Sequence, residues 1–230
     1  MNGSVVVIGG TRGLGREVAR HYVDAGREVV LSGRDRGQAE AVAAELGGKA
    51  RGIAIDVSQP HAVGDGLNDV GPVARLVLSA IERGGNTVDD FDIVGATDLA
   101  TQKLVGYLAV VSALRSRLSD DSAILIFGGQ ARIRPYPGST MVSTVNGGVI
   151  GMVRTLSVEL APIRVNSLHP GIVGDSPFWA EKPAEVLEGF RSRTLTGRLA
   201  SMADILGAAS FLLENESANG IDLALDGGWN

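Results

Sequence analysis

Seven short apolar runs recur along the chain, and stretches with helical spacing separate them. The runs are continuously apolar rather than alternating, which is typical of strands buried on both faces of a parallel sheet. Strand and helix alternation of this kind predicts a doubly wound parallel α/β sheet with right-handed crossovers. The expected strands are residues 4–9, 28–33, 52–56, 74–80, 123–128, 163–169 and 221–226.

Two of the intervening stretches carry leucine and valine at helical spacing, within residues 98–118 and 141–161. A third stretch, residues 174–198, has no such pattern, and loops of this length are often functional lids. The sequence contains no internal repeat and no linker. We therefore expect a single domain, residues 1–230, with a lid at 174–198.

The composition argues against several classes of function. Cysteine is absent, which excludes disulfides and cysteine-based zinc sites, and the three histidines are far apart, so no metal site is expected. A net charge of −5 without a basic patch argues against nucleic-acid binding. The N-terminal residues lack signal-peptide features and no apolar segment reaches membrane-spanning length, so we expect a cytoplasmic protein without a membrane partner.

A glycine-rich loop, GGTRGLG at residues 9–15, joins the first expected strand to a helical stretch. Gly9, Gly13 and Gly15 allow a tight turn and let the backbone approach a pyrophosphate at the positive end of the following helix. Their place between strand and helix favours a dinucleotide site. With its Gly-xxx-Gly-x-Gly spacing, the loop resembles that of the short-chain dehydrogenase/reductase family.

The resemblance extends along almost the whole chain, through VELAPIRVNSLHPGIV (158–173), GRLASMADILGAASFLL (197–213) and NGIDLALDGGW (219–229). It implies a single-domain Rossmann-like fold of about seven strands flanked by helices. It also implies an oxidoreductase acting on a small molecule. Phe178 and Trp179 in the lid suit a partly apolar substrate, although packing at an interface explains them as well. Because the family commonly packs its long helices across a two-fold axis, we expect a homodimer or homotetramer.

The cofactor implied by the resemblance is NADP(H). NAD-binding members of the family carry an acid where this chain has Gly33, followed by Arg34; with Arg12, two guanidinium groups favour the 2′-phosphate of NADP. Asp35, the alternative ribose acid, is expected to cap the next helix. Asp56 has two interpretations, as an adenine contact or as a helix N-cap. The implied cofactor-binding residues are Gly9, Thr11, Arg12, Gly13, Leu14, Gly15, Arg34, Asp56, Val57, Ser79, Ala80, Asn146, Pro170, Gly171 and Val173.

The family's catalytic side chains are replaced in this chain. Its members use a tyrosine, a lysine four residues later, a serine, and an asparagine on the preceding helix. Counting back from RTLSVEL, the tyrosine position falls on Val142 and the lysine position on Asn146. The serine position falls on Gly129 and the asparagine position on Lys103. The standard proton-transfer mechanism is therefore expected to be absent.

Three functions remain open. The first is an oxidoreductase that acts on a carbonyl or alcohol substrate with a non-standard proton donor: Lys103 with Tyr107 one helical turn on, or Tyr136 in the loop after the fifth strand. The second is a catalytically silent NADP(H)-binding sensor or partner protein. The third is a non-redox cyclase, dehydratase or isomerase. We favour the first, an NADP(H)-binding oxidoreductase-like protein, because the cofactor motifs are retained.

Overall fold

A computed structural model describes residues 2–82 and 84–229 of the chain. One seven-stranded sheet forms its centre, with the strand order β3-β2-β1-β4-β5-β6-β7 and every neighbouring pair parallel. This confirms the predicted α/β fold. The strands are β1 (Ser4–Ile8), β2 (Glu28–Gly33), β3 (Lys49–Ala54), β4 (Val73–Leu78), β5 (Leu118–Phe127), β6 (Arg164–Pro170) and β7 (Asp222–Leu225).

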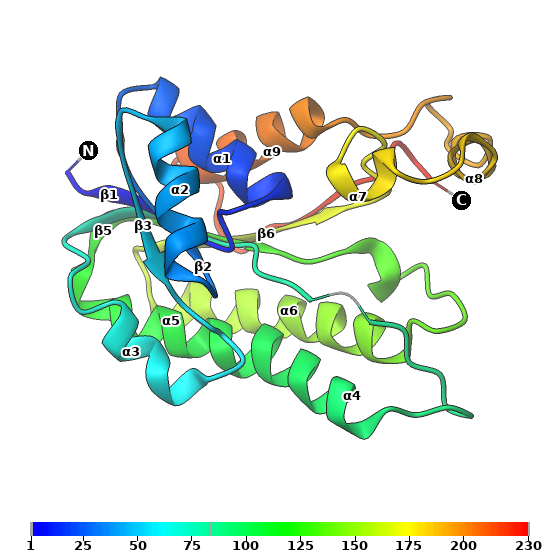
Figure 1. The fold of residues 1–230 in the computed structure, drawn as a ribbon, viewed down its shortest axis with the longest axis horizontal. Helices are drawn as coiled ribbons and strands as arrows, with labels where there is room; N and C mark the ends of the chain where they lie inside the picture. Colours follow the sequence, from blue (N-terminus) through cyan, green and yellow to red (C-terminus); the bar gives the residue numbers. More distant parts are fainter. Residues whose placement is uncertain (1, 83, 230) are drawn as a thin grey trace.

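Helices cover both faces of the sheet (Figure 1). One layer contains α1 (Gly13–Asp24), α2 (Arg36–Leu46) and α9 (Met202–Glu214), and the other contains α3 (Val63–Gly66), α4 (Ile93–Ala100), α5 (Tyr107–Leu114) and α6 (Thr140–Glu159). Two short helices, α7 (Pro177–Ala180) and α8 (Ala184–Arg191), lie beside the C-terminus (Figure 1). The remaining helical turns are η1 (Pro60–Ala62), η2 (Thr101–Gly106), η3 (Arg115–Arg117) and η4 (Gln130–Arg132). No helix in the described residues is long and apolar enough to cross a membrane.

The strands are buried on both faces, as their continuously apolar sequences predict. In β1, Val6 and Ile8 belong to the core that also contains residues of α5 and α6. Val5 and Val7 belong to the opposite core, with residues of α1 and α9. Fully burying a valine or isoleucine side chain stabilises a fold by roughly 1.5–3 kcal/mol, so the central strands hold both helical layers to the sheet.

Two strands differ from the predicted ranges because they contain polar residues. The third strand spans Lys49–Ala54 rather than 52–56, and it is an edge strand, where one side of the ladder is free and polar side chains are tolerated. The fifth strand begins at Leu118 rather than 123, and the next three residues, Ser119–Asp121, are exposed. Apolar runs identify only the buried parts of such strands.

The helical stretch predicted at 98–118 is interrupted. It begins earlier, at Ile93, where the Asp92 side chain accepts a hydrogen bond from the backbone N–H of Gly95 at 3.0 Å. The segment η2 is a π-helical turn, and α5 continues from it. Gly106, at the end of η2, is pressed against the loop after β3, because a Cβ there would lie 2.1 Å from the Val57 carbonyl oxygen. Turns of π-helix occur frequently at functional sites.

The predicted lid at 174–198 contains two short helices and an aromatic cluster. Ring centroids of Phe178 and Trp179 lie 5.2 Å apart, those of Trp179 and Phe190 5.3 Å, and those of Phe190 and Trp229 5.9 Å. All three pairs pack edge to face, a favourable geometry for aromatic rings. The lid is thereby packed against the C-terminal segment. The helices escaped prediction because each is too short to give a clear periodic pattern.

Candidate functional site

The glycine loop forms a close-packed turn at the start of α1. A Cβ at Gly9 would lie 2.5 Å from the backbone nitrogen of Ala80, and one at Gly15 would lie 2.4 Å from the hydroxyl oxygen of Ser79. Only glycine therefore fits where the loop crosses the end of β4. No side chain caps the first backbone amides of α1. An uncapped helix N-terminus beside a glycine turn fits the pyrophosphate of a dinucleotide.

The end of β2 presents one arginine to solvent. Arg34 forms an ion pair with Glu82 at 2.9 Å, and both side chains are exposed. The Asp35 side chain accepts a hydrogen bond from the backbone N–H of Gln38 at 2.6 Å, which confirms that Asp35 caps α2. Arg12, at the N-cap of α1, is also exposed. The donors predicted to face an adenosine phosphate are accessible.

Asp56 stabilises the loop after β3. Its side chain accepts hydrogen bonds from the backbone N–H of Ser58 at 2.9 Å and from the Ser58 hydroxyl at 2.7 Å. The next helical turn begins at Pro60 with Gln59 as its N-cap, so the N-cap interpretation of Asp56 is wrong. The carboxylate instead forms a local turn of the kind that aspartate commonly makes.

Lys103 is buried in the π-helical turn, with 1% of its surface exposed. Its ammonium nitrogen donates a hydrogen bond to the Phe127 carbonyl oxygen and lies 5.1 Å from the centre of the Tyr107 ring. Burial lowers the pKa of Lys103 to about 7. At neutral pH the side chain is therefore divided between its protonated and neutral forms.

Tyr107 lies against Lys103, but the hydroxyl proton of Tyr107 is already engaged in a hydrogen bond. The hydroxyl donates a hydrogen bond to the Ala80 carbonyl oxygen at 2.6 Å. Burial raises the pKa of Tyr107 above its ordinary value, so the phenol stays protonated. Tyr136 lies elsewhere, 54% exposed in the loop before α6. Of the three predicted proton donors, the structure brings only Lys103 and Tyr107 together.

The positions of the missing serine and lysine adjoin one another at the end of β5. A Cβ at Gly129 would lie 3.0 Å from the side-chain nitrogen of Asn146, which is buried on α6. The Asn146 side-chain oxygen is buried without a hydrogen-bond partner. Val142, one turn earlier on α6, is half-buried. Gly129 lies two residues after Phe127, the acceptor of the Lys103 hydrogen bond, so the substituted serine, lysine and asparagine positions form one site.

A chain of buried hydrogen bonds holds the backbone of Gly129 in place. Its backbone N–H donates to Nδ1 of His169 at 3.1 Å, which leaves the ring proton on Nε2. Nε2 lies 2.9 Å from the Ser167 hydroxyl, which in turn donates to Asp222. Burial, reinforced by the positive charge of Arg132, lowers the pKa of His169 to about 4. The imidazole is therefore neutral at physiological pH and serves to orient the backbone.

The turn η4 and the residues directly after it carry polar groups that the sequence did not point to. Gln130 donates from its side-chain nitrogen to Asp226 at 3.0 Å, and its side-chain oxygen is buried without a partner. The Nε atoms of Arg132 and Arg134 are also buried without a hydrogen-bond partner. The available signal was a pair of arginines, with one residue between them, in a loop directly after a buried strand.

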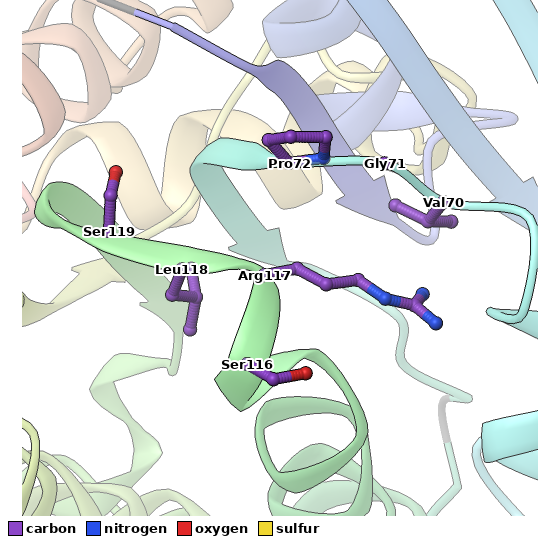
Figure 2. A pocket seen from close by; sticks show the side chains of 7 residues that line it. All are labelled: Val70, Gly71, Pro72, Ser116, Arg117, Leu118 and Ser119. Carbon is purple, nitrogen blue, oxygen red and sulfur yellow. The ribbon is translucent and has the colours of Figure 1, made fainter.

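Two pockets lie at opposite ends of the central strands. One, of about 210 Å³, is lined by Gln102 and Met141, the neighbours of Lys103 and Val142, and by residues of α4 and the loop after β4. The other, of about 350 Å³, is lined by residues 70–72 and 116–119 (Figure 2). Because it adjoins the starts of β4 and β5, it lies away from the substituted positions at the end of β5. In the described residues, no group of three or more histidine or acidic side chains is arranged to hold a metal ion.

Comparison with known proteins assigns the fold to a family. A family model described as enoyl-(acyl carrier protein) reductase matches residues 9–230. A solved short-chain dehydrogenase/reductase from Brucella melitensis, described as a glucose/ribitol dehydrogenase, superposes with a TM-score of 0.90 at 25% identity, covering 98% of this chain and 95% of that one. The chain belongs to the short-chain dehydrogenase/reductase family.

Several relatives within the short-chain dehydrogenase/reductase family are reductases. Carbonyl reductase family member 4 from Danio rerio is 28% identical over 99% of this chain and 98% of its own length. The 3-oxoacyl-[acyl-carrier-protein] reductase from Homo sapiens is 29% identical over 96% and 95%. A 3-ketoacyl-(acyl-carrier-protein) reductase from Brucella melitensis, solved as a complex with NADH, superposes with a TM-score of 0.86 at 26% identity, covering 99% of this chain and 98% of that one. Homologues of this chain are thus NAD(P)-dependent oxidoreductases.

Proposed function

We propose that this chain is an NADP(H)-dependent reductase of a partly apolar carbonyl compound in which Lys103 replaces the usual proton donor. The observation that carries the proposal is a buried amine with a pKa of about 7 beside the end of β5. A general acid works best when its pKa lies near the working pH, so Lys103 is matched to proton donation at neutral pH. The bound nicotinamide would supply the hydride.

The surroundings of Lys103 suit this role. An ammonium group has three N–H donors, and the Phe127 carbonyl takes one; the other two could serve a substrate oxygen only if that oxygen reached the buried amine. The Tyr107 ring packs against the ammonium, and its hydroxyl is held by Ala80, so Tyr107 positions Lys103 rather than donating a proton. Tyr136, exposed on its loop, has no part in the proposed step.

A catalytically silent NADP(H)-binding protein is the second candidate. It is favoured by the burial of Lys103, whose amine already has a protein partner, and by the absence of a hydroxyl at Gly129 and Val142. The test is to measure NADPH binding by fluorescence and NADPH oxidation with a panel of ketones and aldehydes. Turnover with any of them supports the reductase. Binding without turnover supports the silent protein, and neither binding nor turnover contradicts both.

We expect NADPH to bind more tightly than NADH. The exposed Arg34–Glu82 pair contributes about 0–1 kcal/mol, so a 2′-phosphate can displace the carboxylate from Arg34 at little cost. Arg34→Asp should reverse the preference by adding like-charge repulsion against the phosphate. Fluorescence titration of both cofactors measures this, with Arg115→Asp, an exposed arginine on η3, as the control. Equal affinities in the unaltered protein would contradict the role of Arg34.

We also expect a homodimer or homotetramer. Apolar side chains of α4, η2, α5 and α6 are exposed, among them Ile93, Val94, Val105, Leu108 and Val158. A face of this kind is typical of an interface with closed symmetry. Light scattering at micromolar concentration should give a dimer or tetramer, and Val105→Glu with Leu108→Glu should shift it toward monomer. A monodisperse monomer of the unaltered chain would refute the assembly.

A further inference from the structure

Arg132 and Arg134 are half-buried arginines without a counter-ion. Within residues 2–82 and 84–229, neither side chain forms an ion pair or a hydrogen bond, and the Nε atom of each is buried. Other arginines that are buried are fully used: Arg75 pairs with Glu214 at 2.8 Å, and Arg164 donates to three backbone carbonyl oxygens. A buried N–H group without a partner is unfavourable, so the Nε atoms of this pair would gain from a bound anion.

Arg132 belongs to the same site as Lys103, and Arg134 follows it two residues later in the chain. The positive charge of Arg132 lowers the pKa of His169, and the charge of Lys103 adds a smaller effect in the same direction. Both cations therefore lie within electrostatic reach of one imidazole, which holds the backbone of Gly129. Four of the seven buried side-chain atoms without a partner in the described residues belong to this neighbourhood: those of Gln130, Arg132, Arg134 and Asn146.

Neighbouring carboxylates do not neutralise the arginines. Asp222 accepts a hydrogen bond from the Ser167 hydroxyl, and its side chain lies 3.7 Å from His169. Asp226 accepts from Gln130 and from the backbone N–H of Gly228. Neither acid forms an ion pair with Arg132 or Arg134 in the described residues. An external anion is left as the partner that would satisfy the guanidinium groups.

We propose that Arg132 and Arg134 bind an anionic group of the substrate, so that the substrate class is a carbonyl compound carrying a carboxylate or a phosphate. A guanidinium presents a planar fork of donors that matches both groups. The inference rests on the proposed reductase function, because it assigns a substrate to the same site. The anion would hold the molecule by its charged end while its carbonyl oxygen reaches the amine of Lys103.

The experiment measures binding and turnover separately, in the presence of NADP⁺ and NADPH respectively. The probes are 2-oxobutanoate, acetoacetate and 4-oxopentanoate, each compared with its neutral methyl ester, because the spacing of carbonyl and anion is part of the question. Calorimetric titration gives the affinities. The variants are Arg132→Met and Arg134→Met, with Arg132→Lys to keep the charge and Arg154→Met, an exposed arginine on α6, as the matched control.

At least one keto acid should bind more tightly than its ester. Arg132→Met should lower the affinity for that acid by about tenfold to a hundredfold, the worth of a charge-assisted hydrogen bond. The affinity of Arg132→Lys should be intermediate, and that of Arg154→Met should be unchanged. Competition by inorganic phosphate at millimolar concentration would favour a phosphorylated substrate over a carboxylate. Equal binding of acid and ester in all three pairs would overturn the proposal. So would an Arg132→Met variant that melts at the same temperature as the unaltered protein and binds the acid with the same affinity. Anion binding that depends on Arg132 but is followed by no turnover would support the anion site and reject the reductase.

Discussion

Replacing Lys103 by methionine is expected to lower kcat for carbonyl reduction by about a hundredfold or more, the usual effect of losing a positioned general acid. Methionine matches the length of the buried side chain without its amine, so the fold and the glycine loop should be retained. NADPH affinity should change by less than about twofold, because Lys103 contacts none of the predicted phosphate-binding residues. Steady-state kinetics and fluorescence titration on the same preparation measure both quantities.

Tyr107→Phe is the matched control for this experiment. It keeps the ring beside the Lys103 ammonium and removes only the hydroxyl that donates to Ala80. If Tyr107 positions Lys103, kcat should fall far less than in Lys103→Met. The pH profile of kcat separates the two further, since loss of Lys103 should abolish the decline of rate above pH ~7 while loss of the Tyr107 hydroxyl should leave it in place. An unchanged kcat in Lys103→Met would remove this residue from the mechanism.

The fold could be predicted from the sequence because it depends on features that a sequence displays directly. Continuous apolar runs identified all seven strands, and the glycine loop identified the connection between the first strand and the first helix. The errors fall where tertiary context decides. Lys49–Ala54 forms a strand because β2 offers it a partner, and the helical spacing of 98–118 gives no sign of the π-helical turn at Thr101–Gly106.

The site was predictable by position but not by environment. Counting along the family motif located Lys103, Gly129 and Asn146, which the structure brings to the end of β5. Nothing in the sequence indicates that the amine of Lys103 is buried, and its lowered pKa depends on that burial. The unpartnered Nε atom of Arg132 was equally hidden, because it depends on which side chains the fold places around the loop after β5. Chemistry that arises from desolvation is seen only once the chain is folded.

The buried amine should also make stability depend on pH. The folded pKa of Lys103 is about 7 and its ordinary value is 10.5, so between these values the unfolded chain holds a proton that the folded protein lacks. Stability therefore rises with pH across this window, by up to about 1.4 kcal/mol per pH unit. Below pH 7 both states are protonated, and the full penalty of burying the charge, on the order of 5 kcal/mol, is present.

Urea unfolding at pH 6, 7.5, 8.5 and 9.5 gives the free energy of unfolding of the unaltered protein and of Lys103→Met. The difference between the two isolates the contribution of Lys103, because both proteins share the titrations of the other groups. At pH 6 the methionine variant should be more stable by several kcal/mol, at most about 5. Its advantage should shrink steadily up to pH 9.5. Parallel stability curves would mean that the folded pKa of Lys103 is close to its ordinary value. The amine would then be fully charged at neutral pH, and proton donation would lose its physical basis.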